Sequence, residues 1–313
     1  MKKALGIALA AVMSAAMFAG NAMAEEVDLS GKKVGLSFMN TADPVIAELI
    51  TRARAAFDEK GIEVLVSDAG GDSSTQIDAV ENFKNSGCDV VVIQAIDTTA
   101  MSEEAQKLMD DGVKVIAYGM GIDNYDLWYK TDNTEVGTAI GEMAAEWINS
   151  ELDGTAKVEV IGFPMVDVLI ERADAIKAVL AEQCPNAEIV SEISAIDTET
   201  GYSQTETVLA ANPDLNCIVS ISDGPACGAY EAAKAAGLEG DSFAVFGSDL
   251  SNVALQYIAD GTSYKGSTDI DVKVGGDRIA EFCIGLMSGE EMDDIITMNV
   301  TKVTEENVAD YLE

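Results

Sequence analysis

The stretch Trp128–Ile148, WYKTDNTEVGTAIGEMAAEWI, joins the two halves of this chain. Its first four residues have the character of a strand, and Asp132-Asn133-Thr134 supplies side chains that cap helices. From Val136 to Trp147, apolar residues recur at helical spacing along one face. Three complete strand–helix units and a fourth strand precede this stretch, and five units follow it. We therefore interpret it as the crossing from one α/β lobe into another.

The first half alternates strands with helices. Strands are predicted at Lys33–Met39, Glu63–Ser67, Asp89–Ile93 and Val113–Tyr118, and the first helix is predicted to begin after a cap at Asp43. Further helices are predicted at Thr75–Ser86 and Thr99–Asp111. Such alternation predicts a parallel sheet with helices on both of its faces.

The second half repeats this pattern. Strands are predicted at Lys157–Phe163, Glu188–Ile193, Cys217–Ile221, Phe243–Phe246 and Tyr264–Ser267, with helices near 168–183, 201–211, 225–236 and 250–260. A last helix near 272–288 precedes a strand-like tail, Ile295–Val303. The expected fold class is therefore α/β, with two doubly wound parallel-sheet lobes.

Residues 1–24 have the pattern of a secretory signal peptide. Lys2 and Lys3 precede an apolar run, Ala4–Ala19, and Ala22-Met23-Ala24 places small residues at a cleavage site after Ala24. The run is shorter than the roughly 20 apolar residues that span a bilayer, which disfavours a membrane anchor. We expect an exported, periplasmic protein.

The charge balance excludes several functions. Without the signal peptide, 17 basic residues stand against 55 acidic ones, so the net charge moves from −36 to −38. Such a chain is not expected to bind nucleic acid or an anionic membrane. Because the sequence has no histidine, Ser-His-Asp and Cys-His catalysis and the common histidine-bearing zinc sites are also excluded.

Five cysteines are present, none spaced as CxxC. Cys184 ends a predicted helix and Cys217 begins a predicted strand, both at the same edge of one sheet. A bridge between these two and a set of buried free thiols are both compatible with the sequence.

Candidate binding residues follow from the fold, because ligands of open α/β sheets sit beyond the carboxyl ends of the strands. The residues at those ends are Asn40, Asp43, Asp68, Gln94, Asp97, Gly119–Asp123, Met165–Asp167, Ser222-Asp223, Ser248-Asp249 and Thr268–Asp271. This set is polar and mostly acidic, and Arg172, one turn into its helix, is the only nearby cation. A phosphate or carboxylate ligand is therefore disfavoured, and a neutral hydroxylated or a cationic one is expected.

Three other patterns carry no specific chemistry. Gly70-Gly71-Asp72 lacks the Lys-Ser/Thr of a phosphate loop, and Asp197–Gly201 lacks the closing glutamate of a calcium loop. Asp269 and Asp271 alternate along an extended segment, so they are not expected to form a catalytic pair. The sequence predicts no cofactor and no metal.

Several motifs, in this order and spacing, resemble the ribose/galactose-binding (type I solute-binding) proteins of ABC importers. The resemblance covers the whole mature chain. It is carried by Asp68…Asp72…Gln76, Thr131-Asp132-Asn133 with Gly137, Asn212-Pro213-Asp214 before Ser222-Asp223…Ala226-Cys227-Gly228-Ala229, Phe246-Gly247-Ser248-Asp249 and Val303-Thr304-Glu305-Glu306-Asn307-Val308.

The resemblance implies a periplasmic binding protein-like I fold whose lobes are joined by a three-segment hinge. We expect residues 25–132 and 270–294 in the first lobe, and residues 133–269 and 295–313 in the second. Repressors of this fold carry a DNA-binding headpiece, whereas a signal peptide stands in its place here. The family implies a monomer that delivers a sugar-like ligand to a membrane permease.

The family's ligand positions are matched only in part. Asp249 matches the hydroxyl-binding aspartate, Ser222 stands at a neighbouring asparagine position, and Asp269 stands at the last crossing. The family's Asp-Arg pair reads Gly119-Met120, its aromatic pair reads Val45-Ile46, and its first arginine aligns near Ile170. An ordinary pentose or hexose would therefore lack its usual anchors. The predicted ligand set is Asn40, Asp43, Met120, Asp167, Arg172, Ser222, Asp249 and Asp269.

Two rival readings remain open at this point. A binding protein that presents its ligand-bound form to a membrane receptor would share the fold and the export signal. An exported α/β enzyme is disfavoured, because the chain has neither histidine, nor a GxSxG elbow, nor a metal-ligand cluster. For Asp249 the alternative role is to cap the helix that begins near Ser251.

Overall fold

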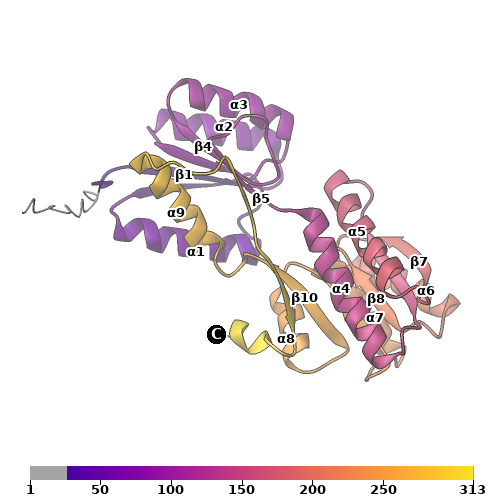
Figure 1. The fold of residues 1–313 in the computed structure, drawn as a ribbon. Helices are drawn as coiled ribbons and strands as arrows, with labels where there is room; N and C mark the ends of the chain where they lie inside the picture. The colour runs from indigo at the N-terminus through magenta and orange to yellow at the C-terminus, as the bar shows by residue number, and fades with distance from the viewer. Residues whose placement is uncertain (1–26, 313) are drawn as a thin grey trace, which may run out of the picture.

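The computed structural model describes residues 27–312, which form two α/β lobes (Figure 1). The predicted signal peptide and its cleavage site after Ala24 lie outside the described residues. Within 27–312, none of the helices has the length and apolar character needed to span a membrane. The expected fold class, with two doubly wound lobes, is confirmed.

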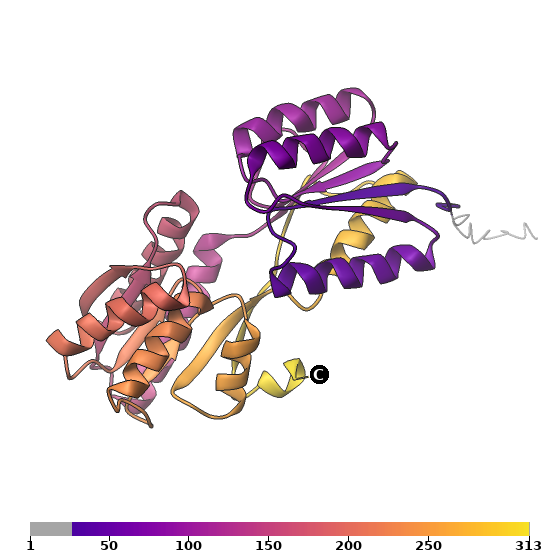
Figure 2. The same ribbon diagram turned by 180° about the vertical axis from the view of Figure 1, so that it is seen from behind.

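The first lobe is a six-stranded parallel sheet in the order β11-β5-β4-β3-β1-β2. Helices α1 and α9 cover one face, and α2 and α3 cover the other (Figures 1 and 2). The strands are β1 (Lys33–Phe38), β2 (Glu63–Asp68), β3 (Val90–Ile93), β4 (Lys114–Gly119), β5 (Leu127–Lys130) and β11 (Ile295–Thr297). The helices are α1 (Pro44–Glu59), α2 (Ser73–Asn85), α3 (Thr98–Asp110) and α9 (Gly275–Ser288).

The second lobe repeats this arrangement in the order β12-β10-β9-β8-β6-β7, with β12 antiparallel to β10 at one edge. Helices α4 and α5 pack on one face of the sheet through an apolar core, and α6, α7 and α8 cover the other face. The strands are β6 (Lys157–Gly162), β7 (Glu188–Ser194), β8 (Cys217–Ser220), β9 (Ala244–Phe246), β10 (Tyr264–Ile270) and β12 (Val300–Thr304). The helices are α4 (Asn133–Glu151), α5 (Asp167–Gln183), α6 (Thr198–Ala211), α7 (Asp223–Ala235), α8 (Asn252–Ala259) and the 3₁₀ helix η1 (Val308–Tyr311).

Three crossings join the lobes, after β5, after β10 and after β11. The sequence predicts one strand-like tail at Ile295–Val303. The structure instead has two strands here, β11 in the first sheet and β12 in the second. Ile295–Thr297 pairs with Trp128, Tyr129 and Lys130 at the edge of the first sheet, so the chain returns to the second lobe only after Thr297. The predicted boundary at 295 is therefore wrong by three residues, because β5 offers an unpaired edge. The boundary at 270 moves by one residue, since Ile270 pairs with Val300 in the second sheet.

Close contact between α4 and α5 depends on a glycine. A Cβ atom at Gly137 would lie 2.1 Å from the carbonyl oxygen of Arg172, so only glycine allows this approach. The contact fixes Arg172 beside the first turn of α4. Gly137, in the stretch Trp128–Ile148, thus determines where Arg172 lies in the second lobe.

All five cysteines are free and buried, which includes both members of the pair considered for a bridge, Cys184 and Cys217. The thiol of Cys184 donates to the backbone carbonyl of Ala145 at 3.5 Å. Of the two readings left open by the sequence, the structure shows the buried thiols.

Candidate functional site

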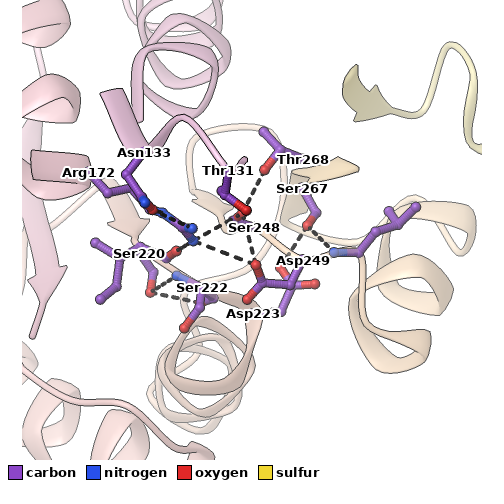
Figure 3. Close-up of polar contacts among 12 residues, drawn as sticks. Thr131, Asn133, Arg172, Ser220, Ser222, Asp223, Ser248, Asp249, Ser267 and Thr268 are labelled. Atoms are coloured by element: carbon purple, nitrogen blue, oxygen red, sulfur yellow. Dashed lines mark hydrogen bonds and ion pairs between the residues drawn. The ribbon is translucent and has the colours of Figure 1, made fainter. Parts of the chain in front are cut away.

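Arg172 is the centre of a polar network at the carboxyl edge of the second sheet (Figure 3). Its Nε and Nη2 donate to Oδ1 of Asn133 at 3.0 and 2.8 Å, and Nη1 donates to the carbonyl of Ile221 at 2.8 Å. Nη1 also lies 3.5 Å from Oγ of Ser248 and from Oδ1 of Asp249. Arg172 is 6% exposed, so burial lowers the pKa of its guanidinium and the Asp249 charge opposes this effect.

This geometry gives Arg172 partners from three segments of the chain. Asn133 comes from the start of α4, Ile221 follows β8 and Asp249 follows β9, so one side chain links three loops. A buried guanidinium with several partners is expensive to displace. That Arg172 contacts ligand stays a prediction, and the structure adds that its guanidinium holds Asn133 and Ile221 beside Asp249.

Asp249 presents a carboxylate that is 47% exposed at the end of β9. Its backbone has φ +90°, a region that aspartate enters more readily than most residues, and Leu250 follows at φ +47°. Desolvation raises the pKa of Asp249, and the charge of Arg172 opposes that rise. The helix cap is Ser251, whose side chain accepts from the backbone N–H of Ala254. The alternative in which Asp249 caps α8 is wrong.

Asp223 is 1% exposed, and both of its carboxylate oxygens accept hydrogen bonds. Its Oδ1 accepts from the hydroxyls of Tyr264 at 2.7 Å and Ser267 at 2.8 Å, and Oδ2 accepts from the backbone N–H of Ser251 at 2.6 Å. Burial, reinforced by the Asp249 charge, raises the pKa of Asp223 to about 7. Asp223 therefore holds the loop after β9 in place and is too enclosed to reach a ligand.

Ser222 starts α7, and its side chain makes no helix-capping bond. It is half-buried, and its backbone is fixed by the hydroxyl of Ser220, which donates to the Ser222 carbonyl at 2.9 Å. Nearby, Thr268 donates to Ser248 at 2.7 Å. Figure 3 shows these hydroxyl groups gathered around Arg172 and Asp249.

The first lobe contributes two exposed side chains at the end of β1. Asp43 caps α1 as predicted, accepting from the backbone N–H groups of Val45 and Ile46. Asn40 accepts from the N–H of Ala42. Desolvation and then the charge of Asp271 raise the pKa of Tyr118, and Asp43 adds to that rise. Asp43 is also the smallest influence that raises the pKa of Asp249, so the charge of this first-lobe carboxylate acts on the second lobe.

The remaining residues of the predicted ligand set are Met120, Asp167 and Asp269. Met120 is half-buried after β4, and Asp167 is exposed at the first residue of α5. Asp269 is 7% exposed, and its Oδ1 accepts from the N–H of Val272 at 2.7 Å. Its neighbour Thr268 bonds within the Arg172 network, so successive side chains of β10 point to opposite sides.

Two residues of this network, Asn133 and Asp223, are absent from the predicted ligand set, and so is Gln76, a buried polar residue of the first lobe. The sequence places Asn133 at a helix start and in a motif, Gln76 in a motif, and Asp223 at a strand end. Gln76 is fully buried, donates to the carbonyl of Gln94 at 2.8 Å and accepts from the N–H of Ile96. Polar residues inside apolar helix faces were the available signal for such supports.

A search of protein-family models matches residues 34–291 to the periplasmic binding protein domain. The match spans most of the chain, both lobes and two of the three crossings. The chain belongs to the periplasmic binding protein family. The resemblance inferred from the motifs is thereby confirmed, and the protein is a solute-binding protein of the type I fold.

Curated relatives of this binding protein cover most of its length. A putative rhizopine-binding protein of Rhizobium meliloti is 26% identical over 85% of this chain and 93% of its own. The D-xylose-binding periplasmic protein of Haemophilus influenzae is 29% identical over 85% of this chain and 81% of its own.

Solved structures show the same fold. A periplasmic solute-binding protein of an ABC transporter from Actinobacillus succinogenes, with bound D-allose, superposes with a TM-score of 0.79 at 21% identity, covering 90% of this chain and 100% of its own. The Caulobacter myo-inositol binding protein, bound to myo-inositol, gives 0.74 at 24% identity, covering 89% and 95%.

Proposed function

We propose that this binding protein captures a small hydroxylated ligand, neutral or cationic, between the carboxyl edges of its two sheets and delivers it to the permease of an ABC importer. The single observation that carries the proposal is the half-exposed Asp249 carboxylate, fixed by a buried Arg172 at the end of β9. Relatives named for xylose and solved structures with allose or myo-inositol support a polyhydroxylated ligand.

The charges of the site support a ligand without an anionic group. Asp43 is exposed beyond β1 on the first lobe and Asp249 is half-exposed beyond β9 on the second, and the oxygens of both can accept hydroxyl or amine protons. Arg172 already binds Asn133 and the Ile221 carbonyl and lies 3.5 Å from Asp249, so most of its N–H groups are engaged and Asp249 offsets its charge. A phosphate or carboxylate entering here would meet negative charge without a free cation to offset it.

Several further features belong to the same proposal. The relatives are periplasmic, which supports export directed by the N-terminal sequence. The relatives are named as binding proteins, which supports a role without catalysis. We also propose that the protein acts as a monomer, because family members of this kind close two lobes of one chain around a ligand.

A thermal-shift screen followed by titration calorimetry tests the ligand class. The panel contains D-xylose, D-allose, myo-inositol, D-glucosamine and ribose 5-phosphate. We expect at least one neutral or amino compound to raise the melting temperature and to bind with one site per chain, as ligand linkage requires. Tight binding of ribose 5-phosphate would contradict the charge argument.

The control for this screen is Asp249→Asn. A hit that binds between the lobes should lose affinity in this variant. A hit whose affinity is unaffected would bind elsewhere and would contradict the proposed site.

A further inference from the structure

Asp271 connects all three crossings between the lobes. It follows β10, its carboxyl Oδ2 accepts from the hydroxyl of Tyr129 at 2.5 Å, and the same oxygen accepts from the backbone N–H of Asn299 at 3.0 Å. The side-chain amide of Asn299 donates to Oδ1 at 3.2 Å. Tyr129 lies at the end of β5 and Asn299 lies between β11 and β12, so each partner belongs to a different crossing.

This group is built into the protein interior. Asp271 is 8% exposed and has φ +51°, and Tyr129 is 1% exposed. Desolvation, followed by the bond to Asp271, raises the pKa of Tyr129, so its hydroxyl remains a donor. A buried carboxylate with three donors is a strong contact, because losing one partner leaves a charge short of hydrogen bonds.

The contacts of Tyr129 attach this group to the first lobe. Its ring packs against Phe282 of α9 at a centroid distance of 5.1 Å and near Tyr118 of β4 at 6.0 Å. Met298, next to Asn299, donates its backbone N–H to the carbonyl of Lys130 at 2.8 Å. All of these partners lie in or beside the first sheet.

A second contact holds the other side of the first crossing. Asn133, at the start of α4, is bound by Arg172 of the second lobe through two donors. Between Tyr129 and Asn133 only Lys130, Thr131 and Asp132 remain. In the other crossings, Ile270 and Val300 are already paired in the second sheet. Few backbone torsions are therefore free to change when the lobes move.

We propose that Asp271, Tyr129 and Asn299 form a hinge clamp that makes the three crossings move as one unit with the first lobe. The clamp confines bending to the residues just beyond it and so limits the range of angles between the lobes. Without it, each crossing bends separately and the ligand-free protein samples a wider range. A ligand must then select its competent geometry from a broader ensemble, which lowers apparent affinity.

The test uses the ligand-free protein, so its outcome is separate from that of the proposed function. Spin labels are placed on cysteines at Glu103 in α3 and Glu182 in α5, which are exposed and lie in different lobes. The native thiols are all buried and are not expected to compete for the label. Pulsed dipolar spectroscopy then reports the distribution of distances between the lobes.

Two variants and one control decide the matter. Tyr129→Phe removes one clamp bond and keeps the packed ring, and Asp271→Asn weakens the whole group. Tyr257→Phe is the control, because it breaks another tyrosine–carboxylate bond, to Glu231, within the second lobe. We expect a broader distance distribution in Tyr129→Phe and Asp271→Asn and an unchanged one in Tyr257→Phe.

Other outcomes would overturn the proposal. An unchanged distribution in folded Tyr129→Phe would show that the bond does not restrict the hinge. Equal broadening in Tyr257→Phe would show a general loss of stability instead of a local effect. Circular dichroism melting of each labelled protein confirms that the measured sample is folded.

Discussion

At the scale of single residues, Ser251 caps α8, so ligand contact is the role left to test for Asp249. The sequence leaves two roles open for Asp249, ligand contact and helix cap. Asp249→Asn keeps a residue type that tolerates positive φ but removes the charge. Losing a charge-assisted hydrogen bond of about 1.5–3 kcal/mol should weaken ligand binding roughly 10- to 150-fold. Titration calorimetry with the compound selected by the screen measures this loss. Nearly equal affinities for variant and wild type would contradict the role of Asp249 as a ligand contact.

The matched control is Ser251→Ala. This change removes the cap of α8, so it should lower stability by about 1 kcal/mol and leave affinity almost unaltered. The two variants therefore affect different measurements. A loss of affinity in Ser251→Ala as large as that in Asp249→Asn would mean that the loop conformation, and not the charge, governs binding.

Glu159 gives a pH-dependent prediction. It is fully buried in β6, Oε1 accepts from Thr205 at 3.2 Å, and Oε2 has no hydrogen-bond partner. Desolvation raises its pKa to about 7 from an ordinary value of 4.5. The folded state therefore binds the proton more tightly, and this residue's contribution to stability decreases as pH rises from about 4.5 to 7.

Glu159→Gln should remove that dependence. The amide keeps the size of the side chain and carries no charge, so it should raise the free energy of unfolding at pH 8 by up to about 3 kcal/mol and change it little near pH 4.5. Urea unfolding at both pH values measures the difference. The control is Glu188→Gln at an exposed position of β7. A stabilisation that is the same at both pH values would contradict the titration.

Residue roles were predictable from sequence only where position alone determines them. The strand-end rule predicts that Asp43 and Asp249 lie just beyond β1 and β9, where the structure has them, and Asp43 caps its helix as expected. The partners of Arg172 were not predictable, because Asn133 lies 39 positions away in the chain and Ser248, next to Asp249, lies 76 positions away. Periodicity gives the face of a helix but not which distant loop packs against that face.

At the scale of elements, α4 and α5 approach closely at Gly137, next to the Arg172 backbone. In Gly137→Ala the added methyl group would overlap the Arg172 carbonyl, so α5 must shift away from α4. Overpacking of this kind typically costs about 1–3 kcal/mol. We expect a lower melting temperature together with weaker binding, because the same shift displaces the Arg172 guanidinium from Asn133 and Asp249.

Ser150→Ala, on the exposed part of α4, is the comparison for this variant. It should alter neither melting nor affinity. Differential scanning calorimetry and titration on the same preparations give both numbers. If Gly137→Ala melted like wild type, the close approach of the two helices would be less rigid than the 2.1 Å contact implies.

The positions of helices and strands were the most predictable part of this fold, and the tail Ile295–Val303 is the exception. The alternation of apolar strands and amphipathic helices located both sheets, because buried parallel strands need continuous apolar runs. The sequence predicts one strand for the tail Ile295–Val303, because all of its residues are compatible with a single strand. Only the free edge of β5 and the antiparallel edge of β10 divide it between two sheets.

At the scale of the whole molecule, binding should bring the lobes together. The candidate acceptors stand on different lobes, Asp43 on the first and Asp249 on the second, so a ligand that contacts both favours a closed arrangement over an open one. Its effect is limited to the difference between its affinities for those two arrangements. Small-angle scattering should therefore show a smaller radius of gyration at saturating ligand.

The same scattering data test two parts of this prediction separately. The forward intensity gives the mass in solution, which should equal that of one chain with and without ligand. Asp249→Asn at the same ligand concentration should stay extended, since the contact on the second lobe is weakened. Constant size in the wild type under conditions where calorimetry shows full occupancy would contradict closure. A mass of two chains would instead place part of the binding surface in an interface between copies, and closure of one chain would no longer explain capture.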